Sequence, residues 1–297
     1  MKKLTSFKVF LSAIKKTIKI KQAILHEPSF DKNEYKELQK AIKSKYVSNT
    51  GKAMKVDEFA LRIKKITKSK FVIPVINGTS ALHIILRSLK INHNHEVLLP
   101  SLGFVAAANA ILYQNAEPHF VDSEYNNLGV DPVKLYDYLK RISIVTNKGC
   151  INKKTKKIIK CLIVTHIFGH SAKILELKKV CKLYKIILIE DAAEALGTRY
   201  RGKHIGNFGL LSALSFNGNK IVTTGGGGAI LTNNKKLFEL CKHISSTSKI
   251  KHDFEFIFDQ IGYNYRLPSL NAALGCAQLK KINIFIKKKE EIIKTSS

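Results

Sequence analysis

The sequence predicts an α/β fold with a mostly parallel sheet, and the main reason is an alternation of two kinds of segment. From about residue 57 onward, short apolar segments typical of strands alternate with segments whose apolar residues recur at helical spacing. The composition, with 45% hydrophobic and 25% charged residues, is that of an ordinary globular protein. A length of 297 residues allows one large core, or a large domain with a smaller annex.

The predicted elements follow one another in a regular order along the chain. Strands are expected at residues 71–76, 96–100, 118–121, 158–165, 186–189, 211–216 and 228–232. Helices are expected at residues 81–90, 106–113, 132–141 and 172–184. The polar, lysine-rich segment 147–157 is expected to be an exposed loop rather than a binding site. After Ser245 the pattern becomes helical, and residues 275–294 are expected to begin a long helix.

The chain carries a large positive charge, because 51 Lys and Arg residues stand against 22 Asp and Glu residues and give a net charge of +29. Such a charge can serve nucleic acid, an anionic membrane surface or a phosphorylated substrate, or it can come from lysines spread over solvated faces. The lysines are scattered, and no known nucleic-acid-binding motif accompanies them. We therefore predict no nucleic-acid partner, while a phosphate-bearing substrate would still benefit from the positive field.

Cysteine and histidine spacing bears on metal binding and on the cellular compartment. The cysteines are widely spaced and contain no CxxC pair, which argues against a zinc site or a disulfide framework and for a reducing cytoplasm. No histidine pair has the helical HExxH spacing, so no metal site is expected. Residues 1–20 are expected to form an amphipathic surface helix rather than a signal peptide. No stretch is long and apolar enough to cross a bilayer, so no stable membrane insertion is expected.

Four segments at strand-to-loop junctions carry residues suited to chemistry, at the position where open α/β sheets bind their ligands. The first is Asn77-Gly78-Thr79-Ser80. Its small residues let backbone amides at a helix N-terminus approach an anion closely, and its hydroxyls add donors. By itself this tetrapeptide is more simply explained as an N-cap. It is neither a Walker loop nor a GxGxxG fingerprint, which argues against an NAD-dependent reductase.

The second segment, Glu190-Asp191-Ala192-Ala193-Glu194, directly follows a predicted strand. A carboxylate at a strand end with small neighbours can lie beneath a heteroaromatic ring and keep the ring nitrogen protonated. In pyridoxal phosphate that protonation makes the ring an electron sink. The alternative, equally supported by these residues alone, is that Asp191 only caps a helix.

The third segment contains the most unusual lysine of the chain. Ser215-Phe216-Asn217-Gly218-Asn219-Lys220 runs into Thr223-Thr224 and four glycines, which allow positive φ and close approach to a ligand. Lys220 stands among small, uncharged residues, where desolvation would favour the neutral amine that attacks an aldehyde. The alternative is a tight turn with an exposed lysine. In the fourth segment, Gly262-Tyr263-Asn264-Tyr265-Arg266, the amide and the guanidinium could bind phosphate or carboxylate.

Taken together, these residues resemble the DegT/StrS-type nucleotide-sugar aminotransferases, which have the type I pyridoxal-phosphate fold. The resemblance runs from about His26 to the C-terminus. The matching segments are His26-Glu27-Pro28, Val47-Ser48 with Gly51, Asn77 to Leu82, Pro100 to Ala106, Phe168-Gly169-His170, Glu190 to Glu194, Ser215 to Gly228, and Asn264-Tyr265-Arg266. The form Ser-Phe-Asn-Gly-Asn-Lys followed by four glycines is similar to the branch that serves bacillosamine and legionaminic-acid pathways.

The resemblance implies pyridoxal 5'-phosphate as the cofactor and assigns roles to individual residues. Lys220 is then the residue that forms the Schiff base and shuttles the proton. Asp191 pairs with the pyridinium nitrogen, and Phe104 stacks on the ring. Cofactor-binding roles are further expected for Gly78, Thr79 and Ser215 at the phosphate, for Ser80 beside them, for Glu194 near the cofactor, and for Asn264 at the phosphate of the neighbouring subunit's cofactor. Many family members have glutamine at the position of Glu194.

The resemblance also implies the reaction, the partners and the domain organisation. The expected reaction transfers an amino group, usually from glutamate, to a nucleotide-linked 4-keto sugar for surface glycan synthesis, in a cytoplasmic homodimer. A family dehydratase would carry histidine at the position of Lys220, and a catalytically silent regulatory protein remains the other alternative. The expected domains are a helical extension at 1–30, the large cofactor-binding domain at 31–245, and the beginning of a small C-terminal domain at 246–297, which is shorter than is usual in the family.

Overall fold

The computed structural model describes residues 8–14, 16, 26–48 and 54–296. The helices are α2 (Lys32–Lys43), α3 (Met54–Thr67), α4 (Gly78–Ser88), α5 (Ala106–Leu112), α6 (Pro132–Ile142), α7 (Ile174–Leu183), α8 (Lys235–Ile244), α9 (Ser269–Lys280) and α10 (Ile282–Ser296). In this part of the chain no helix combines the length and the apolar character that crossing a membrane requires. Residues 8–14 are helical, and the rest of the helix expected at 1–20 lies almost wholly outside the described residues.

The strands are β1 (Phe71–Val75), β2 (His95–Pro100), β3 (Glu117–Val121), β4 (Ser143–Thr146), β5 (Gly149–Asn152), β6 (Ile158–Thr165), β7 (Ile187–Asp191), β8 (Arg199–Tyr200), β9 (Lys203–His204), β10 (Leu211–Ser215) and β11 (Gly228–Thr232). The main sheet has the order β1-β11-β10-β7-β6-β2-β3, and β8 pairs with β9 in a separate hairpin. From β10 to β3 all neighbours are parallel, whereas β11 runs antiparallel between β1 and β10. The predicted α/β fold with a mostly parallel sheet is confirmed.

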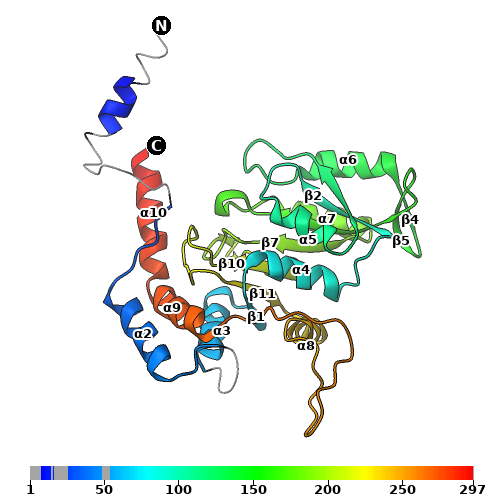
Figure 1. Cartoon of the computed structure of the whole chain (residues 1–297). Helices are drawn as coiled ribbons and strands as arrows, with labels where there is room; N and C mark the ends of the chain where they lie inside the picture. The colour runs from blue at the N-terminus through cyan, green and yellow to red at the C-terminus, as the bar shows by residue number, and fades with distance from the viewer. Residues whose placement is uncertain (1–7, 15, 17–25, 49–53, 297) are drawn as a thin grey trace.

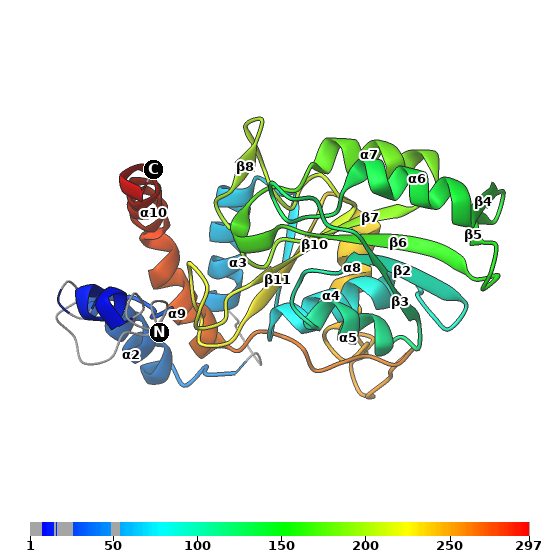
Figure 2. The same ribbon diagram turned by 90° about the horizontal axis from the view of Figure 1, so that it is seen from above.

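Helices cover both faces of the sheet and bury a core on each (Figures 1 and 2). Helices α6 and α7 pack on one face, and α4, α5 and α8 pack on the other. The position of strand β2 between the two cores explains why its sequence is almost continuously apolar. Leu98 enters the core beneath α6 and α7, while Val97 and Leu99 enter the core beneath α4, α5 and α8. A parallel strand between two helical layers therefore needs apolar side chains on both faces.

Several helices begin at side-chain caps that are visible in the sequence. Asp31 and Glu34 form a reciprocal capping box at the start of α2. Asp131 accepts hydrogen bonds from the second and third residues of α6, and Pro132 occupies the first helical position. Asn77 caps α4 in the same way, which fixes the helix N-terminus directly after β1.

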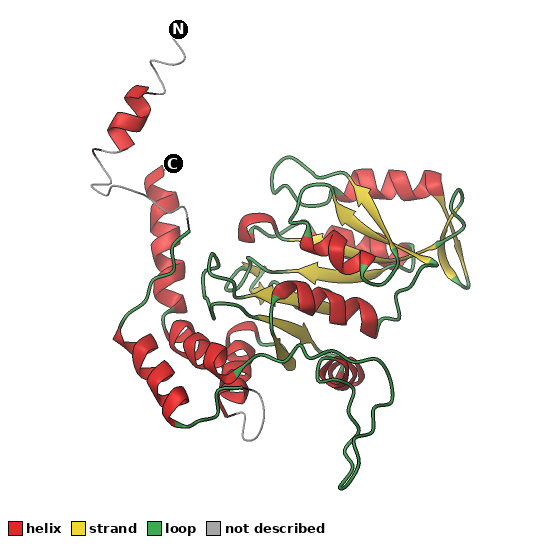
Figure 3. Cartoon of the chain, viewed as in Figure 1, coloured by secondary structure: helices red, strands yellow, loops and turns green. Residues whose placement is uncertain are grey.

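A group of helices, α2, α3, α9 and α10, lies beside the sheet (Figure 3). Helix α9 is rich in small residues, and they are buried against α2 and α3. A side chain at Gly275 would collide with the Phe59 ring of α3, so glycine permits this close packing. The domain boundary expected between residues 245 and 246 stays a prediction.

The structure differs from the expected elements in three places. Segment 147–157 is not only an exposed loop, because β5 lies within it and pairs with both β4 and β6. Residues 246–268 are not helical but form an extended arm, since Lys249 bridges to Phe258 and Arg266 bridges back to Val75 of β1. The helix expected over 275–294 is divided at Lys281 into α9 and α10. In the first place pairing with the neighbouring strands of the chain decides the conformation, and in the second the bridge from Arg266 to distant Val75 does.

Candidate functional site

The carboxyl ends of β1, β10, β7, β6 and β2 meet at one edge of the sheet, and the loops that follow them enclose a cavity of about 560 Å³. This volume lies in the range of sites for small molecules and cofactors. The cavity is lined by Asn77, Gly78, Thr79, Leu82, Leu102, Gly103, Phe104, Ala106, Thr165, His166, Ile167, Phe168, Asp191, Ala193, Glu194, Ser215, Asn217, Asn219 and Lys220. The predicted site residues Ser80 and Asn264 are not among them.

The N-terminus of α4 forms one wall of the cavity and is built to approach an anion. Asn77 caps the helix by accepting a hydrogen bond from the N–H of Ser80 at 2.7 Å, and Ser80 is buried and does not line the cavity. Gly78 and Thr79 remain on the cavity wall with first-turn N–H groups that have no partner within the helix. A Cβ at Gly78 would lie 3.0 Å from Cβ of Ser215. The N-cap and the anion-binding interpretations are therefore compatible.

Close backbone packing supports the same wall. A Cβ on Gly228 of β11 would lie 2.5 Å from the carbonyl carbon of Asn77 and 2.8 Å from the nitrogen of Gly78. Only glycine lets β11 pass this close to the first turn of α4. This glycine is the last of the four that follow Thr224 in the sequence.

Asp191 is the last residue of β7, and its carboxylate is buried at the cavity. Burial raises the pKa of this carboxyl, although the N–H of Ala193, at 3.1 Å, and the positive charge of Lys220 oppose the shift. Turns and loop, not a helix, follow Asp191 up to residue 198, so the helix-cap alternative is wrong. Among the described residues Asp191 has no ion-pair partner, which leaves a buried acceptor available for a cationic ring nitrogen.

Directly behind Asp191 lies a buried pair that the sequence did not reveal. Glu190 accepts hydrogen bonds from the backbone N–H groups of Gly206 (2.8 Å), Phe208 (2.6 Å) and Gly209 (2.6 Å). Its fourth partner is Nε2 of His166, at 3.1 Å. Because the N–H of Ala172 donates to Nδ1 of His166, Nε2 is the nitrogen that carries the proton. Side chains of consecutive residues in a strand point to opposite faces of the sheet. The sequence therefore could have indicated that only one of Glu190 and Asp191 faces the cavity and that the other needs a partner on the opposite side.

Lys220 points into the cavity and has a charged partner. Its Nζ lies 2.8 Å from Oε1 of Glu194, and Oε2 of Glu194 accepts a hydrogen bond from the N–H of Phe168 at 3.0 Å. The expectation of uncharged surroundings is therefore wrong, because Glu194 comes from a different segment. The turn alternative is correct for the backbone, since the N–H of Lys220 donates to the carbonyl of Asn217. The side chain itself is only 16% exposed.

Two exposed aromatic residues line the cavity. Phe104 and Phe168 line it and are 76% and 75% exposed. Asn264 is exposed and lies on the extended arm, where Ser246 bridges to it. Within the described residues no group of three or more His, Cys, Asp or Glu residues could hold a metal ion.

The residues present fit pyridoxal phosphate. A helix N-terminus with a neighbouring hydroxyl suits a phosphate, a buried carboxylate without a described counter-ion suits a protonated ring nitrogen, and a lysine amine suits an aldehyde. The exposed Phe104 ring supplies an apolar face.

Comparisons with known proteins agree with this geometry. The profile of the DegT/DnrJ/EryC1/StrS aminotransferase family matches residues 28–297. The chain is 34% identical over 268 residues to the GDP-perosamine synthase of Escherichia coli O157:H7, covering 90% of this chain and 68% of that protein. It is 36% identical over 267 residues to the UDP-4-amino-4,6-dideoxy-N-acetyl-beta-L-altrosamine transaminase of Campylobacter jejuni subsp. jejuni serotype O:23/36 (strain 81-176), covering 89% of this chain and 66% of that protein.

A solved structure shows the same fold. Helicobacter pylori PseC, an aminotransferase involved in the biosynthesis of pseudoaminic acid, superposes with a TM-score of 0.79 at 29% sequence identity. The match covers 91% of this chain and 68% of that chain.

Proposed function

The chain belongs to the DegT/DnrJ/EryC1/StrS aminotransferase family, whose members use pyridoxal phosphate, and on this basis we propose that it aminates a 4-keto sugar carried on a nucleotide, with glutamate as the amino donor. The observation that carries the proposal is the meeting of Lys220, buried Asp191 and the N-terminus of α4 in one cavity. Two relatives are named for work on GDP-linked and UDP-linked amino sugars, which supports a nucleotide sugar as the acceptor. The product would serve the synthesis of surface glycans.

The residues of the cavity divide the work between holding the cofactor and moving protons. Gly78, Thr79 and Ser215 would hold the phosphate, Asp191 would pair with the ring nitrogen, and Phe104 would cover the ring. Bound pyridoxal phosphate supplies an electron sink for the bond made or broken at the amino-bearing carbon. Lys220 Nζ is the atom that would bond to the cofactor aldehyde and afterwards carry the proton to and from the substrate carbon.

Glu194 would hold Lys220 in place before the cofactor arrives, through the 2.8 Å contact between Nζ and Oε1. The amino donor and the keto sugar would use the same cavity in turn, in two half-reactions. The dehydratase alternative is disfavoured, because the cavity presents a lysine where those enzymes carry histidine.

We further propose a cytoplasmic homodimer with shared sites. Asn264 is exposed and does not line the cavity of its own chain, so it is free to reach a cofactor phosphate in a partner subunit. The described cysteines are all buried and unbridged, in keeping with a reducing compartment.

The proposal is tested by absorption spectroscopy of the purified chain with pyridoxal phosphate, before and after borohydride reduction. We expect a visible band that reduction removes, with the cofactor then fixed to the peptide that contains Lys220. Lys220→Ala should abolish the band and the fixation. Lys235→Ala is the matched control, because that side chain is 76% exposed on α8 and is not among the residues that line the cavity. A wild-type chain without a band, or a band that survives in Lys220→Ala, contradicts the assignment.

The acceptor is then identified with a panel of keto sugars on uridine and guanosine carriers, with glutamate as donor. Formation of an amino sugar on either carrier supports the proposed reaction. If the cofactor binds but none of the sugars is aminated, the cofactor assignment stands and the acceptor is wrong.

A further inference from the structure

A second cavity, of about 480 Å³, lies at the opposite, amino-terminal edge of the main sheet. Its walls come from the beginnings of β2 and β3, the carboxyl end of α6 and the turn that follows β5. Figure 2 shows β4 and β5 at the end of the sheet away from α9. The two cavities share no lining residue, so this one is independent of the candidate active site.

The second cavity is organised around a buried carboxylate. Glu96 is only 1% exposed and accepts hydrogen bonds from Nδ1 of His119 at 2.7 Å, from Nδ2 of Asn152 at 3.0 Å, and from the hydroxyl of Thr155. Burial alone would raise the pKa of Glu96, but the hydrogen bonds from His119, Thr155 and Asn152 outweigh it and lower the pKa. Nε2 of His119 lies 2.9 Å from the hydroxyl of Tyr138 on α6. The carboxylate is thus fully engaged by protein groups and is not available to a ligand.

Glu96 also fixes the turn after β5, which carries Lys153 and Lys154 into the wall of the cavity. Oδ1 of Asn152 accepts hydrogen bonds from the N–H groups of Lys154 (3.0 Å) and Thr155 (3.4 Å). The same side chain donates to Glu96, so the turn 153–155 is tied to a buried anchor. Nζ of Lys153 donates to the carbonyl of Arg141 at 2.9 Å, which joins the turn to the end of α6. These contacts fix the backbone of the turn and Nζ of Lys153 before any ligand arrives.

The cations around this cavity exceed the carboxylates that could neutralise them. Among the described residues neither Arg141 nor Lys154 forms an ion pair with a carboxylate. The other acidic residue of the lining, Glu117, is already paired with Lys157 at 2.7 Å. The wall therefore presents an excess of positive charge.

Aromatic surface lies next to these cations. The guanidinium of Arg141 lies 5.9 Å from the centre of the Tyr138 ring. Phe120 of β3 also lines the cavity and is 56% exposed. An exposed phenylalanine beside uncompensated cations suits a ligand with one flat apolar part and one anionic part.

We propose that this cavity is a second ligand site, which binds a phosphate monoester of a planar ring. Arg141, Lys153 and Lys154 contact the phosphate, and Phe120 and Tyr138 contact the ring. Guanidinium and ammonium groups are the side chains that bind phosphate most strongly, and Arg141 can do so with two parallel hydrogen bonds. The segment 147–157, expected to be an exposed loop, thereby supplies two of the three cations.

Phenyl phosphate is the probe, used on the full chain with calorimetry and hydrogen exchange. We expect saturable binding that slows exchange in peptides covering residues 138–157. The double variant Arg141→Gln/Lys154→Gln should weaken this binding about tenfold or more, because it removes two charge-assisted contacts. Arg201→Gln is the matched control, since Arg201 likewise lies over a tyrosine ring, at 5.7 Å from Tyr200, on another part of the surface. It should change the affinity by less than about twofold.

Peptide-level exchange separates this site from the phosphate-binding wall of the candidate active site. Protection confined to residues 77–82, or no protection at up to about 10 mM probe, overturns the proposal. Equal weakening by Arg201→Gln also overturns it. Lys154→Gln alone is the second variant, because this exposed side chain has no described partner whose loss would disturb the fold. It should also weaken binding, and an unchanged affinity overturns the proposal. Inorganic phosphate tests the ring contact. Equal affinity for it and for phenyl phosphate would show that Phe120 and Tyr138 do not contact the ligand, and would overturn that part of the proposal.

Discussion

Asp191 and Lys220 line the same cavity, but only Lys220 has an oppositely charged partner among the described residues. The carboxylate of Asp191 is buried and has no described counter-ion, so burial raises its pKa. Lys220 keeps a carboxylate partner in Glu194, which is 37% exposed. Without the cofactor the ionised form of Asp191 therefore destabilises the folded state, and a cationic ligand nitrogen would remove that destabilisation.

Asp191→Asn should therefore have opposite effects on stability and on cofactor binding. A carboxyl group whose pKa is raised in the folded state lowers stability progressively as the pH rises from its unfolded pKa through its folded pKa. The cofactor-free variant should thus melt at or above the wild-type Tm near neutral pH, and this advantage should vanish in acid. Its affinity for pyridoxal phosphate should fall about tenfold or more, because a buried charge pair is lost.

Thermal unfolding between acid and neutral pH, with a cofactor titration monitored by absorbance, measures both effects. Asp122→Asn is the control, because that side chain is 71% exposed and should leave Tm and affinity unchanged. A cofactor-free Asp191→Asn chain that melts below wild type, or that binds the cofactor as tightly, would refute this account of Asp191.

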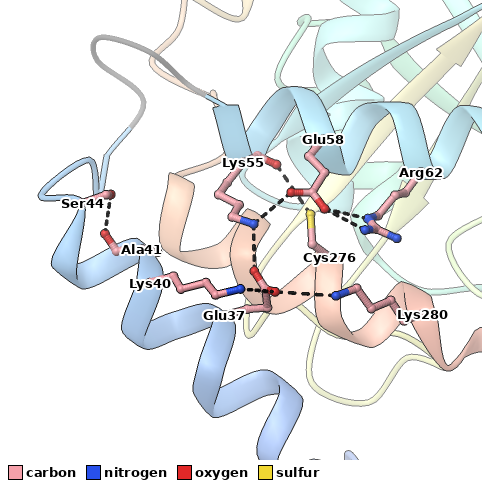
Figure 4. Close-up of polar contacts among 9 residues, drawn as sticks. All are labelled: Glu37, Lys40, Ala41, Ser44, Lys55, Glu58, Arg62, Cys276 and Lys280. Atoms are coloured by element: carbon pink, nitrogen blue, oxygen red, sulfur yellow. Dashed lines mark hydrogen bonds and ion pairs between the residues drawn. The ribbon is translucent and has the colours of Figure 1, made fainter.

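At the scale of elements, one ion-pair cluster joins α2, α3 and α9 (Figure 4). Glu37 of α2 lies 2.8 Å from Nζ of Lys55 on α3 and 3.6 Å from Nζ of Lys280 on α9. The hydrogen bond from Lys55 lowers the pKa of Glu37 from its ordinary 4.5 to about 2, although burial opposes the shift. These helices are connected through a charge as well as through the small buried residues of α9.

Glu37→Gln should reduce the free energy of unfolding at neutral pH and have no effect in strong acid. A carboxylate with a depressed folded pKa contributes its full stabilisation above pH 4.5 and loses it as the pH falls toward about 2. The loss at pH 7 should be on the order of 1 kcal/mol, because Lys40 and Lys280 are screened by solvent.

Urea unfolding of wild type and variant at pH 7 and near pH 2 measures the difference. The control is Glu239→Gln, which removes an ion pair of 3.9 Å in which both side chains are well exposed. The same loss at both pH values would show that the cluster acts through packing and not through charge.

At the scale of the whole molecule, the sheet separates two ligand-sized cavities at opposite edges. One edge collects the carboxyl ends of parallel strands, with Lys220 and Asp191. The other carries a fixed cationic turn next to Glu96. The extended arm that holds Asn264 belongs to neither cavity, and this placement leads to a prediction about the dimer.

Mixed dimers of Lys220→Ala and Asn264→Ala chains should recover activity that neither variant has in quantity by itself. If Asn264 acts on the partner's cofactor, random pairing leaves about a quarter of the sites with both residues intact. If Asn264 acted within its own chain, mixing would restore nothing. Amination of the keto sugar, measured before and after the two purified variants are denatured and refolded together, distinguishes the two cases. Sedimentation should show the dimer in each sample.

Periodicity along the chain was enough to identify the α/β fold, and strands 158–165 and 228–232 occur with the expected boundaries. It also located the cavity residues of 77–79, 191, 215 and 220, because strand ends of a parallel sheet meet at one edge whatever the details of packing. Tertiary contacts decided the rest. The bridge from Arg266 of the arm to Val75, the pair His166–Glu190 and the Lys220–Glu194 contact all join residues far apart in sequence. Local patterns reflect each segment's own preferences, whereas these contacts depend on which segments the folded sheet brings together.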